Sequence, residues 1–509
     1  MKEPDQTATV ADASPETSPK ISASPPGQGV RVLQNSVVVL LSRGLGLVMA
    51  AAASFILARY LGPERMGEYG AIYAYLTLFV WVASFGLSSI LTREAAQNRD
   101  QAGSIIYTGI WISAGFAAVT VLAALVLAPI LHLGGQLYPL VAIASIEILL
   151  LVPFGLPSVI FVVDMKQWFS SAFSIIRQTL MFLIVVGLYR AGASLLYVVL
   201  GRLTVAAIET ALNWYVGRRF LAPPRNFHAP VARQLIGQGF TMALCIFTIN
   251  IYTRVDQVML HVMSSDRILG QYVVAARVSE LFEALPAAFI ASLFPLLCVS
   301  VLDPARFQRH LDLGYRYMMI AAAGICVVCC VGARPIMRLA YGPKYDASGP
   351  LLAILIWSEI AIFYGSVVLN ALLAAKLQQY ALWATVAGAV ANLGLNLYLI
   401  PHWDATGAAW ATVVSYWAGW ILALLPFRAT RHILAVGLRS LVPVTAIALT
   451  VSACAFLLRM NAWGRTGIAV VTYSGLILLC GFVRREDFIS LGLGWNKFIA
   501  WKNNRGSAA

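Results

Sequence analysis

Runs of about 20 or more apolar residues recur along the whole chain, and they restrict its fold more than any other feature of the sequence. A helix needs about 20 apolar residues to cross the hydrocarbon core of a bilayer. Only helices and closed barrels satisfy backbone polar groups in lipid, and long runs without strict alternation favour helices. The sequence therefore predicts an all-α integral membrane protein. We expect about fourteen spans, at residues 35–60, 67–92, 105–130, 137–162, 168–189, 195–217, 235–260, 270–299, 315–337, 350–373, 380–400, 406–427, 436–458 and 466–483.

The composition agrees with a polytopic membrane protein and excludes a soluble globule. Hydrophobic residues make up 60% of the 509 residues and charged residues only 11%. The net charge of +14 would suggest nucleic-acid binding in a soluble protein. Here most Lys and Arg fall in loops on one side of the predicted spans, so we exclude nucleic acid as a partner. The positive-inside rule then places both termini in the cytoplasm.

An internal repeat divides the chain into two halves. The order acid, Arg, Gly-x-Tyr occurs in Glu64-Arg65-Met66-Gly67-Glu68-Tyr69 and again in Asp266-Arg267-Ile268-Leu269-Gly270-Gln271-Tyr272. Lys166-Gln167-Trp168 recurs loosely at 376–380, and Gly192-Ala193 recurs as Gly407-Ala408. These matches keep their order, and each joins spans of equal rank. The first six spans and the next six therefore look like two copies, an arrangement common in secondary transporters, whose substrate site lies between the repeats.

The repeat gives the expected organisation of the chain. We predict a disordered cytoplasmic tail at 1–34, an N-terminal six-helix lobe at 35–220, a basic cytoplasmic linker at 221–234, a C-terminal six-helix lobe at 235–430, two additional helices at 431–485, and a basic cytoplasmic tail at 486–509.

Five arginines lie inside the predicted spans. A charge at the centre of a membrane helix costs about 2.5 to 3.5 kcal/mol, so it is retained where it faces a polar interior. Arginine suits phosphate groups because its planar guanidinium offers paired donors and stays charged when desolvated. The pattern predicts a polar cavity that favours an anionic cargo. The five residues are Arg43, Arg177, Arg202, Arg254 and Arg277.

Helical spacing separates these charges into groups. Arg277 and Glu280 are neighbours on one helical face, and Glu283 lies one step further round. Arg254 shares a stripe with Asn250, whereas Asp256 lies about 200° away in an ideal helix. Arg254 and Asp256 are therefore not expected to face the same cavity.

Each group of charged residues has a possible structural role as well as a possible functional one. Arg177, Arg202 and Asn250 are candidates either for the cavity or for contacts that hold helices together. Intramembrane carboxylates also bind coupling cations or carry protons. Asp256, Glu280 and Glu283 are thus candidates for an H⁺ or Na⁺ coupling site.

An ordered set of short motifs resembles a known family. In the first half the motifs lie at residues 61–63 (LGP), 67–70 (GEYG), 85–87 (FGL) and 93–95 (REA). In the second half they lie at residues 250–256 (NIYTRVD), 270–272 (GQY), 275–277 (AAR), 341–345 (YGPKY), 392–396 (NLGLN), 400–401 (IP) and 407–409 (GAA). Together they cover about residues 33 to 430 and resemble bacterial polysaccharide-repeat-unit flippases of the Wzx type. The sequence departs from that pattern where the usual Gly after Ile-Pro is replaced by His402-Trp403-Asp404.

The resemblance implies a fold, a function and a location. The family belongs to the multidrug/oligosaccharidyl-lipid/polysaccharide exporter superfamily, whose two six-helix lobes form a V around a central cavity. Its members move an undecaprenyl-diphosphate-linked oligosaccharide from the cytoplasmic to the periplasmic leaflet of the bacterial inner membrane, by alternating access, for exopolysaccharide, capsule or O-antigen synthesis. A polysaccharide polymerase and a chain-length regulator become candidate partners. On the repeat, Arg43, Arg254 and Arg277 are expected to converge on the diphosphate.

Two other functions remain open at this stage. A multidrug antiporter of the same superfamily would share the fold, although it would favour acidic residues for cationic drugs. A membrane polysaccharide polymerase or ligase would also handle lipid-linked sugar, but it generally needs a large outer loop. The sequence has no P-loop, GxSxG or HExxH motif. We therefore predict a transporter rather than an enzyme, without a cofactor or a metal site.

Overall fold

The protein is built from long helices. The computed structural model describes residues 28–221 and 226–483, with side chains from residue 44 onward apart from several between 238 and 251, and this part of the chain contains no strand. Eleven helical segments within it are long and apolar enough to cross a membrane. The predicted all-α membrane fold is confirmed.

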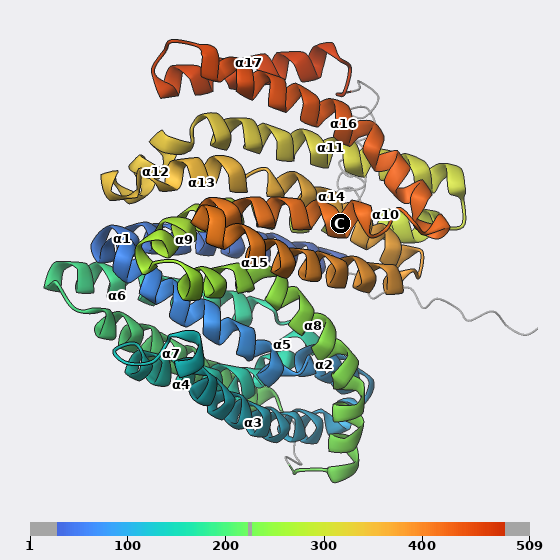
Figure 1. Cartoon of the computed structure of the whole chain (residues 1–509). Coiled ribbons are helices and arrows are strands. Elements are labelled where there is room, and N and C mark those ends of the chain that lie inside the picture. The colour runs from blue at the N-terminus through green and yellow to red at the C-terminus, as the bar shows by residue number, and fades with distance from the viewer. Residues whose placement is uncertain (1–27, 222–225, 484–509) are drawn as a thin grey trace, which may run out of the picture.

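The helices form two groups that follow the order of the chain, as Figure 1 shows from blue to orange. The first group consists of α1 (Gln28–Ser84), α2 (Leu87–Gln97), α3 (Ala102–Leu127), α4 (Tyr138–Phe154), α5 (Val159–Val163), α6 (Trp168–Ala191) and α7 (Leu195–Phe220). The second consists of α8 (Ala229–Met263), α9 (Asp266–Glu280), α10 (Ala284–Ser300), α11 (Pro304–Val331), α12 (Ala333–Tyr341), α13 (Ser348–Leu355), α14 (Ser358–Ala374) and α15 (Gln378–Trp417). The last helices, α16 (Arg428–Leu457) and α17 (Ala462–Leu479), lie along the outer side of the second group.

Two helices each contain two of the predicted spans. Helix α1 covers the first and second spans and breaks only at Gly62, and α15 covers the eleventh and begins the twelfth, with a break at Asp404. A straight helix as long as α1 would extend about 85 Å, more than twice the hydrocarbon thickness, so the chain reverses at Gly62. Helix α8 matches the seventh predicted span but is not among the eleven apolar segments. The number fourteen therefore stays a prediction.

Some element boundaries differ from those that the sequence predicts. Helix α1 begins at Gln28, inside the predicted N-terminal tail, and α8 begins at Ala229, inside the predicted linker. The second span ends at Ser84 rather than at residue 92, because Phe85 and Gly86 both have positive φ and cannot continue a helix. The rest of the predicted tails, 1–27 and 484–509, and residues 222–225 of the linker lie outside the described residues.

The internal repeat is visible in the backbone of one turn. Met165 and Lys376 both have positive φ, and each amide donates to the carbonyl three residues earlier at 3.1 Å. The next amides, of Lys166 and Leu377, donate to the carbonyls five residues earlier at 2.7 Å. These turns precede α6 and α15, which have equal rank in the two groups. Their register pairs Lys166 with Leu377, one residue from the pairing that the sequence suggested.

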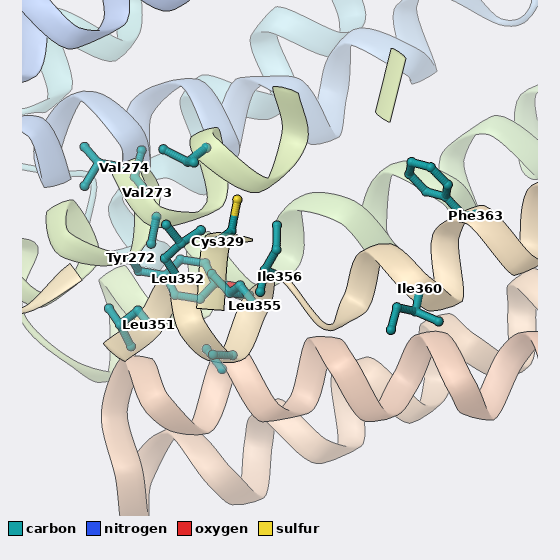
Figure 2. Close-up of a cluster of buried hydrophobic side chains, with 14 of the residues drawn as sticks. Tyr272, Val273, Val274, Cys329, Leu351, Leu352, Leu355, Ile356, Ile360 and Phe363 are labelled. Atoms are coloured by element: carbon teal, nitrogen blue, oxygen red, sulfur yellow. The ribbon is translucent and has the colours of Figure 1, made fainter. Parts of the chain in front are cut away.

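The second group has a continuous apolar core around α13. Figure 2 shows Leu351, Leu352 and Leu355 of this helix together with Tyr272 of α9 and Cys329 of α11. All five side chains are buried. Burial of such side chains stabilises the group by about 25 cal/mol per Å² of apolar surface. This core anchors α9, the helix that also faces the first group.

The backbones of the two groups touch at the end here called the Gly62 end, which contains the breaks at Gly62, Ser265, Gly342 and Asp404. A side chain on Gly67 would overlap the backbone of Asp266, and a side chain on Gly270 would overlap the carbonyl of Pro63. The two glycines of the repeated motif thus let α1 and α9 touch through their backbones. Two further bonds join the groups nearby: the Arg59 Nε donates to the Ala340 carbonyl at 3.0 Å, and the Tyr345 hydroxyl donates to the Ala58 carbonyl at 2.9 Å.

Exposed tryptophans mark both ends of the bundle. Trp403 and Trp463 are more than half exposed at the Gly62 end. Trp168 and Trp383 are about half exposed at the opposite end, called the linker end because α7 ends and α8 begins there. Tryptophan is enriched at both membrane–water interfaces. The bundle therefore crosses the membrane with these two ends at its surfaces.

Candidate functional site

A cavity of about 740 Å³ lies between the two groups of helices. It extends along both arms of α1, from Leu47 before the break to Thr77 after it. Each of these residues lies about 22 Å along its helical arm from Gly62 at 1.5 Å per residue, so the cavity reaches deep into the bundle. Its charged lining comes from both groups and consists of Glu147, Arg177, Arg202, Glu209, Arg254, Arg277 and Glu280.

The arginines of the first group each have a carboxylate from a neighbouring helix. Arg202 of α7 lies 3.2 Å from Glu147 of α4, and Arg177 of α6 lies 3.4 Å from Glu209 of α7. The Arg202 guanidinium also donates to the Tyr69 hydroxyl at 3.0 Å and stacks 3.7 Å from the centre of the Tyr73 ring. These are one-to-one pairs that join helices. They leave little excess charge on this wall.

Two arginines of the second group share one carboxylate. Arg254 of α8 lies 2.6 Å from one oxygen of Glu280, and Arg277 of α9 lies 3.5 Å from the other oxygen. The three side chains are between 23% and 41% exposed, so they face the cavity rather than the apolar core. In the direct ion pairs of this wall, two guanidiniums face one carboxylate. This wall therefore carries more guanidinium donors than carboxylate acceptors among its direct ion pairs.

A second, smaller cavity of about 210 Å³ lies behind this wall, inside the second group. Four carboxylates line it: Asp256, Glu280, Glu283 and Glu359. Asp256 accepts hydrogen bonds from the Tyr272 hydroxyl and from the Gln257 amide, and Ser279 donates to one oxygen of Glu359 at 2.8 Å. The other Glu359 oxygen is buried without a hydrogen-bond partner. A buried carboxylate oxygen in this state needs a proton, a cation or water.

Several helices around the smaller cavity are interrupted, although α8 is continuous. Helix α9 ends at Glu280 and continues through a 3₁₀ turn, Leu281–Glu283, into α10. Helices α13 and α14 are separated at Ile356 and Trp357, directly before Glu359. Helix α15 continues past Tyr416 into a π-helix, Ala418–Leu422. Broken spans and π-helices concentrate at binding sites, because they free backbone groups and re-aim side chains.

Comparison with protein families now identifies the chain. A model of the polysaccharide biosynthesis protein family matches residues 56–350, which is more than half of the chain and includes both arginines that share Glu280. The chain belongs to this family. A relative from Haloferax volcanii, described as the probable flippase AglR, is 30% identical over 203 residues. That match covers 38% of this chain and 40% of the relative, so the chain matches less than half of the relative's length.

The fold of this chain is similar to that of solved transporter structures. A structure of the lipid II flippase MurJ in an inward closed conformation matches 90% of this chain and all of its own, with a TM-score of 0.68 and 15% identity. An inward-facing multidrug resistance MATE family transporter of the MOP superfamily matches 78% of this chain and 98% of its own, with a TM-score of 0.60 and 12% identity. At these identities the likeness shows the fold. The similar proteins are flippases and transporters rather than enzymes.

The structure places the predicted charged residues in different positions. Arg254 and Arg277 lie together on the central cavity, with Glu280 between them. The Arg43 side chain lies outside the described residues. Asn250 is buried in α8 and lines neither cavity described above.

The expected separation of Arg254 and Asp256 is only partly correct. Asp256 does not line the central cavity, in agreement with its helical angle. Both residues, however, line the smaller cavity. A helical wheel gives only the direction in which a side chain leaves the helix. The Arg254 side chain is long enough to line both cavities. Glu283 also faces the smaller cavity.

Several residues of the site were not selected from the sequence. The partners Glu147 and Glu209 come from other spans, and no sequence spacing links them to their arginines. Glu359 belongs to no recognisable sequence motif. Its position as a single carboxylate in an apolar run nevertheless indicated a polar surrounding. Aromatic residues, whose faces can stack on sugars, are dense in the tenth to twelfth predicted spans. Among the described residues none of them lines the central cavity, and only Tyr416 reaches the smaller one.

Proposed function

We propose that the protein is a flippase that carries a lipid-linked oligosaccharide from the cytoplasmic to the periplasmic leaflet of a bacterial inner membrane. Undecaprenyl diphosphate is the proposed carrier lipid, and the product serves exopolysaccharide, capsule or O-antigen synthesis. The protein acts as a secondary transporter without chemistry of its own. Family membership and a relative described as a probable flippase support this function.

One observation carries the proposal: the central cavity holds a pair of arginines that exceed their carboxylate partner. A diphosphate needs several strong donors, and two guanidiniums provide them in paired geometry. Each also stays charged when it is desolvated. The cavity volume of about 740 Å³ falls within the range of known ligand cavities, about 300 to 1,000 Å³. In this proposal Arg254 and Arg277 bind the diphosphate, and Arg43 completes the site from the first group.

Alternating access assigns a role to the closed end. We place the Gly62 end at the periplasmic face, because this orientation puts the basic linker and both termini in the cytoplasm. The backbone contact between Gly67 and Gly270 then closes the periplasmic exit. Release of the cargo requires α1 and α9 to separate there. In such transporters the two repeats rock against each other around a fixed site.

A reconstituted system tests the function. Purified protein in vesicles containing a fluorescent lipid-linked oligosaccharide should equalise headgroup accessibility between the leaflets. The double substitution Arg254→Gln and Arg277→Gln should abolish this movement while the protein still folds. Arg306→Gln is a matched control, because Arg306 is 69% exposed outside the cavity and pairs with Asp303. If the double variant moved the lipid as fast as the unaltered protein, the assignment of Arg254 and Arg277 to the site would be wrong. If the unaltered protein moved no lipid, the proposed flippase function would be wrong.

A multidrug antiporter is the second candidate function, and the smaller cavity is the observation that favours it. Four carboxylates would attract a cationic drug. The volume of about 210 Å³ is nevertheless below the roughly 300 Å³ at which ligand cavities begin, so the cavity fits an ion better than a drug. Among the described residues no group of three or more His, Cys, Asp and Glu is arranged to hold a metal ion, which favours H⁺ over Na⁺ as the ion. Within the proposed function we assign Asp256, Glu280 and Glu283 to coupling with H⁺ or Na⁺. Drug-driven uptake of H⁺ or Na⁺ would support the antiporter.

A further inference from the structure

Glu280 is the one carboxylate among the described residues that lines both cavities. Its two oxygens are divided between Arg254 and Arg277, so it occupies both guanidiniums at once. An anionic headgroup that binds these arginines from the central cavity must compete with Glu280. Binding of the headgroup therefore depends on where this carboxylate can go.

Glu280 lies where the regular α-helix ends. It is the last residue of α9, and a 3₁₀ turn follows it. A carboxylate at the C-terminal end of a helix is disfavoured by the partial negative charge of the helix terminus. Only its ion pairs offset that cost. Among the side chains that the structure describes, these two arginines are the ion-pair partners of Glu280.

The smaller cavity is the place that the released carboxylate can reach. It is already acidic, so an additional unpaired charge there is unfavourable unless a cation neutralises it. The ionisable groups that face it are Arg254 and Asp256 from α8, Tyr272 and Glu280 from α9, Glu283 from the 3₁₀ turn, Glu359 from α14 and Tyr416 from α15. The unpartnered oxygen of Glu359 shows that this cavity has an unused acceptor.

We propose that Glu280 couples the two cavities: it blocks the phosphate-binding arginines until a monovalent cation, H⁺ or Na⁺, neutralises it in the smaller cavity. Cation binding then frees Arg254 and Arg277 for the headgroup, and headgroup binding in turn strengthens cation binding by the same factor. This reciprocity is required by thermodynamic linkage. The inference rests on the proposed function. It adds the residue through which the ion acts.

Binding measurements test the coupling separately from transport. Farnesyl diphosphate, a short lipid diphosphate, is titrated into the full-length protein in nanodiscs at low and high pH, and with Na⁺ or choline as the bulk cation. In the unaltered protein the affinity should rise by about tenfold or more when the coupling cation is present. The pH series and the Na⁺ series show which cation acts. Glu280→Gln should bind the probe tightly under all conditions and lose the cation dependence.

Two further variants keep the test decisive. Glu209→Gln removes a carboxylate from an Arg–Glu pair of the central cavity that does not touch the smaller one, and it should keep the cation dependence. Glu283→Gln alters only the smaller cavity and should reduce the cation dependence even if Glu280→Gln does not fold. Full cation dependence in both Glu280→Gln and Glu283→Gln overturns the coupling.

The outcomes also separate this inference from the proposed function. Probe binding without any cation dependence in the unaltered protein overturns the coupling and leaves the flippase assignment intact. Absence of both probe binding and lipid movement overturns the flippase assignment itself.

Discussion

The two groups of helices use the same residue types around the central cavity with different results. In the first group Arg177 and Arg202 each have their own glutamate, and the pairs join α4, α6 and α7. In the second group Arg254 and Arg277 compete for a single glutamate, which also belongs to an acidic cavity. One wall is electrostatically balanced and the other is not. The comparison indicates that two copies of a repeat can share a fold and still differ in their ion pairs. In one copy each arginine has its own glutamate, and in the other two arginines share one.

The largest expected effect on stability is at the contact between α1 and α9, to which each half of the chain contributes one glycine of the repeated motif. Gly270→Val puts a branched side chain against the carbonyl of Pro63 and the amide of Gly67, two backbone groups that cannot move aside as a flexible side chain would. We expect a loss of more than about 3 kcal/mol in unfolding free energy, or permanent separation of the Gly62 end. Equilibrium unfolding in mixed micelles measures the loss, and spin-label distances between α1 and α9 detect the separation.

Gly115→Ala is the control for this substitution, because the helical Gly115 of α3 has open space around it. Alanine there should leave the protein as stable or raise its stability by up to about 1 kcal/mol. Equal stability of Gly270→Val and the unaltered protein would mean that the two halves are not held together by this contact.

The balanced wall should respond to a lost arginine mainly through stability. Arg202→Gln leaves Glu147, which is 9% exposed, without its cation. We expect a loss of roughly 2 to 3 kcal/mol, below the full cost of breaking a buried pair because Arg202 itself is 37% exposed. A double-mutant cycle with Glu147→Gln should recover much of this loss. A stable Arg202→Gln variant that fails to bind a lipid diphosphate would contradict the contrast between the two walls.

The second pair of this wall should matter less. Arg177 is 41% exposed and lies 3.4 Å from Glu209, so solvent weakens their attraction. Arg177→Gln should cost about 1 kcal/mol or less. The same unfolding assay, repeated at high salt, should show this small difference shrinking further. A loss as large as that of Arg202→Gln would show that the two pairs are equivalent.

The smallest effect is expected at the break in α15. Asp404 has φ 47° and ψ −133°, a conformation that favours glycine and costs another residue about 1 to 3 kcal/mol. Its carboxylate accepts a hydrogen bond from Ser264 at 2.8 Å, which stabilises by about 1 kcal/mol. Asp404→Gly removes both terms and adds an entropy cost of about 0.5 to 1 kcal/mol for glycine, so the terms largely cancel and stability should change by roughly 1 kcal/mol. Ser264→Ala should lose the bond without relieving the strain and should therefore be the less stable of the two.

The fold was readable from the sequence because length and apolarity decide which segments cross a membrane. The sequence also revealed the repeated motif and matched Gly67 with Gly270. It did not predict that these two glycines touch, which the structure shows. The partners of Arg177 and Arg202 depend on which spans lie side by side, and sequence spacing carries no such information. The smaller cavity depends on a 3₁₀ turn and a π-helix, neither of which has a sequence signature in this chain. The residue types of the site were therefore predictable, and their pairing was not.

The reversal of α1 at Gly62 has a practical consequence for experiments on membrane topology. Helix continues on both sides of this residue, and Gly62 is the one non-helical position in α1. A reporter domain, an epitope or a protease site inserted there would have to break a helix, so a negative result would say nothing about which compartment the segment faces. The connection at Gly134 and Gly135 is a better position, because neither glycine is in a helix and Gly135 has open space around it.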